Sequence, residues 1–429
     1  MSNSVLLSQN HSALVNQMQS LAQANDFLYS TAPSTPVMSK TILKLSPENK
    51  VNTTANSQEL TYKLPKRGMV SRMYLKVTLT QDGDVEENKT SNMYGSEIVE
   101  RVDLVARGRV LRTALSDARQ AQSCRGKAYS ELSFPGRYGT EGVDSGFTSN
   151  YDIATQWGRS AGRSLGAGDV SFIVPIMSNH IGWELDNFLG NAYDGLFCEQ
   201  LHLRVRLANT SSSSVTGSVL KTGAGVIEHK SCDLIMEVLN ETDEAYRKYR
   251  NTNFPTESNL KRLVQTAEQE PTQEINFTNG VSDVFPLYTG GVCNKTIIRI
   301  QTTNADHLGI NNKIDGFVLR SGGRVVYEQR PSTVGAYRKA NMIDRVADRA
   351  EPTSNNSLPF IICWDELCEK MSNNTSGAVN YSELPNLTLE LTTWHKGING
   401  AHNVHICHIK SQFEQIDSNS GMVAVSERA

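Results

Sequence analysis

The stretch from Gln200 to Asn209 alternates apolar and polar side chains without interruption. Its apolar positions are Leu201, Leu203, Val205 and Leu207. A period of two predicts a β-strand with one buried and one solvated face. The segment Asn386 to Thr393 repeats the pattern with three alternating leucines, far downstream. A chain that carries this strand twice is constrained to an architecture with a repeated β unit.

Segments around these two strands also recur, and in the same order. The pairs are Arg72–Leu79 with Lys295–Thr302 (offset 223), Leu104–Val110 with Phe317–Val325 (215), Ser171–Pro175 with Pro359–Cys363 (188), the two alternating strands (roughly 185) and Asp233–Leu239 with Asn403–Ile409 (170). The offset only falls along the chain, as expected if a second copy kept its strands and shortened its loops. We therefore predict two copies of one all-β module.

The domain organisation follows from this repeat and from changes in composition. We predict an N-terminal amphipathic helix and extended arm over 1–57, a first module over 58–250, a second over 251–416 and a polar tail over 417–429. The helix covers Ser4 to Leu28, and 31–57 is a proline-containing linker. Its apolar stripe either docks on a neighbouring subunit or apolar surface, or packs on its own domain. A second helix is expected at Ser116–Ser130, and a helical or extended arm at Val334–Ala350.

The bulk composition excludes several classes of protein. The 42 Lys and Arg residues nearly balance 45 Asp and Glu, so the chain is not suited to wrapping nucleic acid. Its seven scattered cysteines favour reduced thiols over a disulfide framework. The N-terminus has no secretory pattern, and no window approaches the roughly 20 apolar residues of a transmembrane helix.

Three groups of residues carry side chains that can bind metal ions. His405 and Cys407 would share one face of a strand, whereas His402 and His408 would share the other, so no four ligands converge. A half-buried strand with polar and thiol side chains explains this cluster, which also includes His395, more simply. Cys363 and Cys368 lack a second pair. The acidic loop lacks the glycine and terminal glutamate of a calcium loop and is interpreted as solvated: Asp82, Asp84, Glu86 and Glu87.

Catalytic and ligand-binding patterns are equally incomplete. A retaining glycosidase needs two carboxyl groups about 5 Å apart, and the candidates flank loop tryptophans: Asp365 with Glu366, and Glu184 with Asp186. The four tryptophans could stack on sugars, but such residues more often anchor a core or interface: Trp157, Trp183, Trp364 and Trp394. Gly223 and Gly225 are not followed by a phosphate-loop lysine, and no GxSxG turn is present. We predict no catalytic, cofactor or metal site.

The chain resembles the double jelly-roll major capsid proteins of tailless icosahedral viruses, especially membrane-containing phages. The resemblance lies in Ile98–Leu111 leading into Ser116–Ser130, in Phe172–Pro175 (FIVP), in Leu201–Asn209 (LHLRVRLAN) and in the N-terminal helix. It implies an all-β fold of two tandem eight-stranded jelly-roll sandwiches with short flanking helices. Homotrimers of that family form pseudo-hexamers that tile the shell.

The resemblance also implies the partners of such a subunit. These are neighbouring capsomers, penton or minor capsid proteins, and an internal membrane beneath the N-terminal helix. The location would be the virion capsid, after synthesis inside the host cell. The long loops Tyr138–Gly168 and Thr210–Gly225 would then lie at towers or between subunits. We expect a structural, non-enzymatic protein; the alternative is a carbohydrate-binding or adhesive β-sandwich, such as a viral spike or glycan-binding module.

Overall fold

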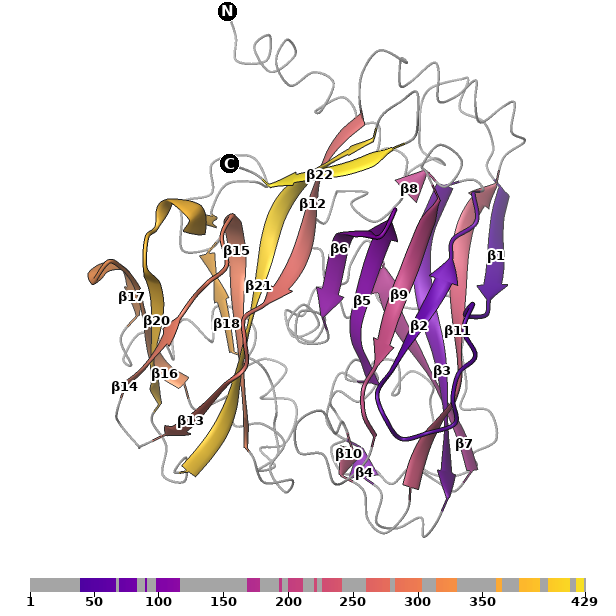
Figure 1. Cartoon of the computed structure of the whole chain (residues 1–429), viewed down its shortest axis with the longest axis horizontal. Coiled ribbons are helices and arrows are strands. Elements are labelled where there is room, and N and C mark those ends of the chain that lie inside the picture. The colour runs from indigo at the N-terminus through magenta and orange to yellow at the C-terminus, as the bar shows by residue number, and fades with distance from the viewer. Residues whose placement is uncertain are drawn as a thin grey trace, which may run out of the picture.

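The computed structural model shows an all-β architecture in two parts that lie side by side (Figure 1). The elements with described bounds are strands, apart from one 3₁₀ helix, η2 (Tyr381–Glu383). The structure describes residues 39–66, 69–82, 89–90, 98–115, 168–177, 193–194, 200–210, 220–221, 226–240, 260–277, 282–302, 314–329, 360–364, 378–393, 400–416 and 422–427.

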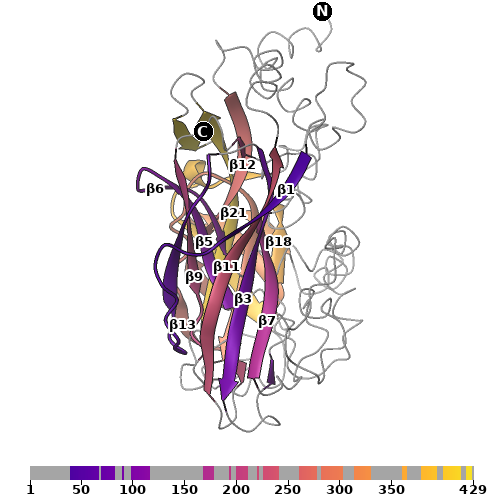
Figure 2. The same cartoon turned by 90° about the vertical axis from the view of Figure 1, so that its right-hand side faces the viewer.

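The first module is built from two antiparallel sheets. One has the strand order β1, β11, β3, β7, with β8 beside β3, and the other has the order β2, β9, β5, β6. Figure 2 shows β11, β3 and β7 side by side on one face. The strands are β1 (Ser39–Leu45), β2 (Gln58–Lys63), β3 (Met69–Asp82), β5 (Val99–Ala106), β6 (Arg109–Leu115), β7 (Gly168–Met177), β8 (Tyr193–Asp194), β9 (Leu201–Leu207) and β11 (Val226–Asn240), and a separate pair is formed by β4 (Lys89–Thr90) and β10 (Leu220–Lys221).

The second module has the same plan. One sheet has the order β12, β21, β15, β18, with β13 and β22 beside β21 and β19 beside β15, and the other has the order β14, β20, β16, β17. The strands are β12 (Leu260–Gln269), β13 (Gln273–Phe277), β14 (Ser282–Pro286), β15 (Val292–Thr302), β16 (Ile314–Ser321), β17 (Arg324–Gln329), β18 (Phe360–Cys363), β19 (Val379–Asn380), β20 (Leu387–Thr393), β21 (Gly400–Ile416) and β22 (Val423–Glu427). The predicted duplication is therefore present in the order of the four main strands of each sheet, and β13 and β22 are additions of the second module.

The two hairpins show how closely the modules correspond. The β5–β6 turn has Arg107 and Gly108 at φ 49° and 76°, and the β16–β17 turn has Gly322 and Gly323 at φ 53° and 83°, each 215 positions later (322 − 107). Positive φ at both central residues gives the tight turn that matches the twist of paired strands. A β-bulge follows Leu104 in one hairpin and Leu319 in the other, again 215 apart. The predicted offset of 215 is confirmed by turn and bulge alike.

The alternation that predicted the organising strand is visible in its burial. Leu201, Leu203, Val205 and Leu207 of β9 are buried, whereas Arg206 is exposed. They join a core cluster that fills the space between the two sheets of the first module. Leu387, Leu389 and Leu391 of β20 occupy the corresponding place in a second, separate core. Each module therefore has its own hydrophobic interior.

The register corrects two of the predicted offsets. Val77 pairs with Phe172 in the first module, and Ile298 pairs with Phe360 in the second. With β7 and β18 aligned at 188 (360 − 172), β3 and β15 are related by 221 (298 − 77) rather than 223. Val77 also pairs with Cys232 of β11, and Ile298 pairs with Ile406 of β21. The offset between β11 and β21 is therefore 174 (406 − 232) rather than the predicted 170. Because each error is an even number, the faces of these strands were assigned correctly.

Two segments that composition assigned to an arm and a tail contain strands of the sandwich. β1 lies within the proline-containing linker and pairs along its whole length with β11. β22 lies within the polar tail and pairs with β21, and its Val425 packs against the core of the first module. Both strands are short and only half apolar, so composition hides them. The helices predicted at Ser4–Leu28, Ser116–Ser130 and Val334–Ala350 lie outside the described residues.

Candidate functional site

The two modules meet where the edge strand β6 of the first lies against β12 and β21 of the second (Figure 1). Arg112 of β6 faces Glu414 of β21, with Nε and Oε2 2.9 Å apart and each side chain only 1% exposed. Two opposite charges removed from water must remain paired, because an uncompensated buried charge is costly. The pair therefore links the two modules at one defined position.

Hydrogen bonds complete this contact along the edge of β6. Gln412 Nε2 donates to the carbonyl oxygen of Leu111 at 2.6 Å. The backbone N–H of Thr113 donates to Thr266 Oγ1 at 3.0 Å. An edge strand normally leaves such backbone groups available to any passing chain. Here side chains of the second module satisfy them.

An apolar cluster accompanies these polar contacts. Leu115 of the first module packs with four residues of the second, all of them buried: Ala267, Ile297, Cys407 and Ile409. The contact thus combines a dry apolar patch, a buried ion pair and paired edge-strand backbone. This combination is typical of a permanent interface between folded units rather than of a flexible link.

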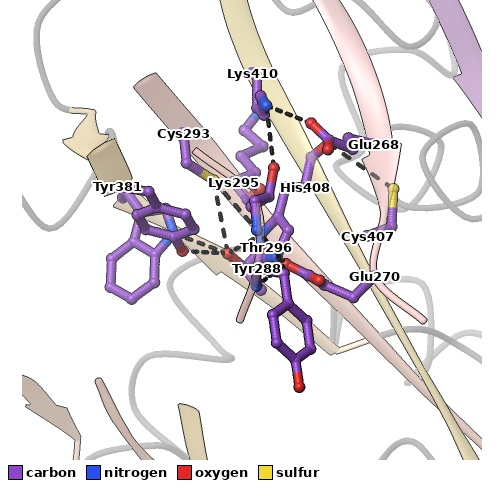
Figure 3. A network of polar contacts seen from close by, with 12 residues as sticks. Glu268, Glu270, Tyr288, Cys293, Lys295, Thr296, Tyr381, Cys407, His408 and Lys410 are labelled. Carbon is purple, nitrogen blue, oxygen red and sulfur yellow. Dashed lines mark hydrogen bonds and ion pairs between the residues drawn. The ribbon is translucent and has the colours of Figure 1, made fainter. Parts of the chain in front are cut away.

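A second group of buried polar side chains lies inside the second module (Figure 3). Thr296 of β15 is its centre. Its Oγ1 lies 3.0 Å from His408 Nδ1 and 2.9 Å from the Tyr381 hydroxyl, and it accepts a hydrogen bond from Trp364 Nε1 at 3.0 Å. With His408 doubly protonated, Thr296 accepts from Trp364 and His408 and donates to Tyr381. Thr296 Oγ1 is then saturated, with two hydrogen bonds accepted and one donated.

Glu270 connects this network to a loop. Its Oε1 accepts the backbone N–H groups of Tyr288 and Thr289, both at 3.0 Å, and lies 3.4 Å from His408 Nε2. Burial raises the pKa of Glu270, but hydrogen bonds from His408 and these backbone groups lower it overall. Burial lowers the pKa of His408, but hydrogen bonds to Cys293 and Glu270 and their charge raise it to about 9. Glu270 and His408 therefore form a buried ion pair at neutral pH.

Neither buried group has the geometry of a reaction centre. His408 is 0% exposed and Glu270 4%, so the network is sealed from substrate. Lys410, also buried, is tied to Glu268 and to Thr289 Oγ1, the latter at 3.0 Å. Thr289 links the two groups, because its backbone N–H donates to Glu270 and its hydroxyl oxygen accepts from Lys410. The arrangement positions backbone and fills the core, which is a structural role.

The structure places some of the predicted candidates. His405 and Cys407 lie on one face of β21: Cys407 is buried at the contact between modules, while Thr272 Oγ1 lies 3.2 Å from His405 Nδ1. His408 lies on the opposite face, as predicted. Among the described residues, no group of three or more His, Cys, Asp or Glu side chains could hold a metal ion. Trp364 is 1% exposed and belongs to the second core, so it is not a sugar-stacking residue.

The other candidates lie outside the described residues. They are Asp84, Glu86 and Glu87, Trp157, Trp183, Glu184 and Asp186, Gly223 and Gly225, Asp365, Glu366 and Cys368, and Trp394 and His395. The side chains of Asp82, Cys363 and His402 are likewise not described, although their backbone lies in strands. Each of these assignments stays a prediction.

Comparison with solved structures settles the fold. The match to a chain in a quasi-atomic model of the PBCV-1 virus capsid covers 94% of this chain and 100% of that one, with a TM-score of 0.58 and 12% sequence identity. The match to the Faustovirus major capsid protein covers 95% of this chain and 99% of that protein, with a TM-score of 0.53 and 9% sequence identity. The match to the mavirus major capsid protein covers 94% of both chains, with a TM-score of 0.50 and 9% sequence identity. The chain has the double jelly-roll fold of viral major capsid proteins. No family model and no curated protein matches the sequence.

The capsid-protein fold confirms the resemblance predicted from short sequence patterns. It spans both modules, because the matches cover nearly the whole of each chain. At 9–12% identity the likeness lies in the backbone and not in particular side chains. In the described part of the chain, no helix is both long and apolar enough to span a membrane.

Sequence reasoning missed the residues that join the two modules. The segment Ile98–Leu111, on which the resemblance was based, ends one residue before Arg112, and Glu414 was not singled out. One signal was available: Arg112 stands in RVLRTAL, among apolar residues, at the position of Tyr327 in the second copy (327 − 112 = 215). A charge in a strand that is otherwise buried needs a partner. The sequence does not say that the partner lies 302 positions away (414 − 112).

Proposed function

We propose that this chain is the structural subunit of an icosahedral viral capsid, in which three copies close into a pseudo-hexameric ring and the rings tile the shell. The observation that carries the proposal is one strand order present in two adjacent modules, in a fold shared with capsid proteins along 94% of the chain. Three chains with two like modules each present six similar lobes. Such a ring closes through heterologous, head-to-tail contacts.

Each module is proposed to be a complete eight-stranded jelly roll. The proposed strands of the first are β1, β2, β3, β5, β6, β7, β9 and β11, and those of the second are β12, β14, β15, β16, β17, β18, β20 and β21; the matching strand orders of the two modules support this choice. The predicted boundaries 58–250 and 251–416 contain these strands except β1, which the 1–57 arm contributes. Closed pairs of sheets suit a shell because they leave few free strand edges.

The proposal extends to the surroundings of the subunit. Neighbouring capsomers, penton or minor capsid proteins, and an internal membrane beneath the N-terminal helix are the proposed partners. The proposed location is the virion capsid, reached after synthesis inside the host cell. The role needs neither catalysis nor a cofactor. The near balance of 42 basic and 45 acidic residues supports a subunit that does not itself wrap the genome.

A carbohydrate-binding or adhesive protein is the competing proposal. It depends on exposed aromatic side chains, and Trp364 is buried in the second core, where it donates to Thr296. The adhesive role therefore loses one of the four tryptophans that motivated it. We retain the capsid role as the function best supported.

Light scattering coupled to gel filtration tests the proposal on the purified full chain. A particle near three times 47.3 kDa that persists at high salt is the expected result, because large apolar interfaces resist screening. A species of 47.3 kDa at every salt and protein concentration would contradict the capsid role and favour the adhesive one.

A further inference from the structure

A buried histidine of the first module lies where β9, β11 and the connection between β1 and β2 meet. His229 of β11 is 0% exposed, and its Nε2 lies 2.9 Å from the carbonyl oxygen of Ala208, which follows β9 in the opposite sheet. Its backbone N–H donates to the carbonyl oxygen of Thr54, between β1 and β2, at 3.0 Å. One residue therefore holds three segments of the chain together.

Backbone hydrogen bonds close the same end of the sandwich. The N–H of Thr210 donates to the carbonyl oxygen of Ala55 at 2.8 Å, and the N–H of Ala208 donates to that of Ile98 at 2.8 Å. Backbone groups do not change their charge near neutral pH. Among the residues that make these contacts, His229 alone has a side chain whose charge can change there.

The two ring nitrogens of His229 differ in their surroundings. A carbonyl oxygen only accepts, so Nε2 carries the proton of the neutral ring and Nδ1 carries none. No group in the described part of the chain is hydrogen-bonded to Nδ1. A second proton would place a charge, and a donor without an acceptor, inside the core. Burial accordingly lowers the pKa of His229, although the bond to the Ala208 carbonyl raises it.

No described carboxylate faces the ring to offset such a charge. Directly across the ladder on β3 lies Leu79, which is 1% exposed. The charged side chains of the surrounding strands and connection are exposed or half-exposed and, by the alternation of the strands, lie outside the sandwich. They are Glu228 and Lys230 of β11, Asp169 of β7, Arg204 and Arg206 of β9, Glu100 of β5, Glu59 of β2, and Glu48 and Lys50 of the connection.

The fold does not require a histidine at this place. Leu79 pairs with His229, and by the offset of 221 its equivalent is Ile300, which pairs with Val404. Val404 is 1% exposed and belongs to the second core. One module thus has an apolar residue where the other has a titratable one. Packing alone is served by the valine, so the histidine adds a site that can take up a proton.

We propose that His229 is an acid-sensitive latch, whose protonation opens the end of the first module at β9, β11 and the β1–β2 connection while the second module stays closed. The latch goes beyond the proposed assembly and does not depend on it. Because the pKa of His229 is lowered in the fold, its contribution is complete above the ordinary value of 6.5 and is lost as the pH falls below it. His408 has the opposite sign, since its pKa is raised to about 9.

Hydrogen exchange of the wild-type full chain at pH 7.5 and 5.5, followed by mass spectrometry, tests the latch. The readout is the protection factor, which is the exchange rate of an unstructured peptide at the same pH divided by the observed rate. In peptides that contain Ala208, Thr210 and His229, protection should fall by up to about tenfold, because opening takes up one proton. Peptides of the second module that contain the hydrogen-bonded N–H groups of Glu270 and Leu287 should keep or gain protection.

Two variants separate the imidazole from the packing around it. His229→Gln keeps a neutral donor for the Ala208 carbonyl, and its protection should not change between the two pH values. Tyr62→Phe is the matched control. It removes another side-chain bond between the sheets, from the Tyr62 hydroxyl to the Cys232 carbonyl at 2.9 Å, which does not titrate in acid. This variant should retain the pH response of the wild type.

The wild type alone can overturn the latch, even if His229→Gln does not fold. Protection at the three latch amides that changes by less than about twofold, or that falls equally in both modules, would do so. A folded His229→Gln protein that keeps the pH response would also overturn it. Each of these results leaves the capsid role untouched, because that role is tested by the mass of the assembled particle.

Discussion

The two modules share a backbone plan but fill the same place in their cores differently. In the first, Leu75 of β3 pairs with Leu234 of β11, and both are 0% exposed. By the register above, the equivalent pair in the second is Thr296 with His408, also 0% exposed. One copy thus has an apolar pair where the other has the centre of a hydrogen-bonded network.

This difference teaches what the fold requires at that position. Both positions are fully buried. The leucines have no polar side-chain atoms, whereas in the network Thr296 is hydrogen-bonded to Trp364, Tyr381 and His408, and His408 is paired in charge with Glu270. The described part of the first module also has buried polar contacts: the Tyr62 hydroxyl donates to the Cys232 carbonyl oxygen, and His229 Nε2 contacts the Ala208 carbonyl oxygen, both at 2.9 Å. The backbone therefore accepts either chemistry, provided that each is complete. A partial version of the polar solution should be worse than either.

Removing Glu270 is the strongest test of that completeness. Glu270→Ala leaves the His408 imidazolium buried without its carboxylate and frees two backbone N–H groups. We expect the free energy of unfolding to fall by about 4–5 kcal/mol. Urea denaturation of the full chain measures it. The control is Glu274→Ala, an exposed carboxylate on β13, for which about 0.5 kcal/mol or less is expected. Equal losses in the two variants would show that the network contributes nothing.

Breaking the ion pair between modules tests whether the two cores unfold together. Glu414→Ala leaves Arg112 buried and uncompensated, with an expected loss of about 3–4 kcal/mol. A matched surface pair is available in Arg206 and Glu100, with the charged atoms 3.0 Å apart and side chains 54% and 44% exposed. Glu100→Ala should cost only about 0–1 kcal/mol. Calorimetry is the measurement: a single transition in the wild type should split in two in Glu414→Ala, and an unchanged single transition would contradict the role of the pair.

The two cores should also differ in their response to alkaline pH. Because the pKa of His408 is raised from 6.5 to about 9, its contribution is complete below pH 6.5 and is lost as the pH rises toward 9. We expect the second module to lose roughly 2–3 kcal/mol across this range. Thermal melting from pH 6 to 9.5 follows the change. His408→Gln should remove this part of the dependence, and a wild type with a flat profile would argue against the ion pair.

The two hairpin turns offer the smallest and most symmetrical comparison. Arg107 adopts φ 49° where the second module has Gly322 at φ 53°, and a side chain in this left-handed region costs about 1–2 kcal/mol. No atom lies within 4 Å of a Cβ built on Gly322, so the cost of Gly322→Arg should be purely conformational, about 1 kcal/mol. Arg107→Gly should change stability in the opposite direction. Denaturant midpoints measure both, and changes of the same sign would break the equivalence of the turns.

The architecture could be predicted from the sequence because apolar and polar residues alternate along a strand that has one buried and one solvated face. That period predicted the β9 and β20 strands and the duplication, and the recurrence of Leu104–Val110 in Phe317–Val325 predicted the correspondence of the two hairpins at an offset of 215. β1 and β22 were missed because a short strand at an edge needs few apolar residues. Their identity depends on the partners β11 and β21, which local sequence does not reveal.

The polar contacts could be predicted from the sequence only in part. The histidine cluster near residue 405 drew attention to β21, and the assignment of His405 and His408 to opposite faces was correct. Which face holds a network depends on Glu270 and Thr296, which lie 138 and 112 positions away from His408 (408 − 270 and 408 − 296). Such pairings arise from tertiary packing, and a period along one strand carries no information about them.

Two like modules per chain are proposed to make three chains into one ring of six lobes. Electron microscopy of the purified full chain, with two-dimensional averages of single particles, tests it most directly. Our account predicts particles with six similar lobes around a pseudo-sixfold axis and true threefold symmetry. Particles with only two lobes, or open filaments without a closed ring, would contradict it.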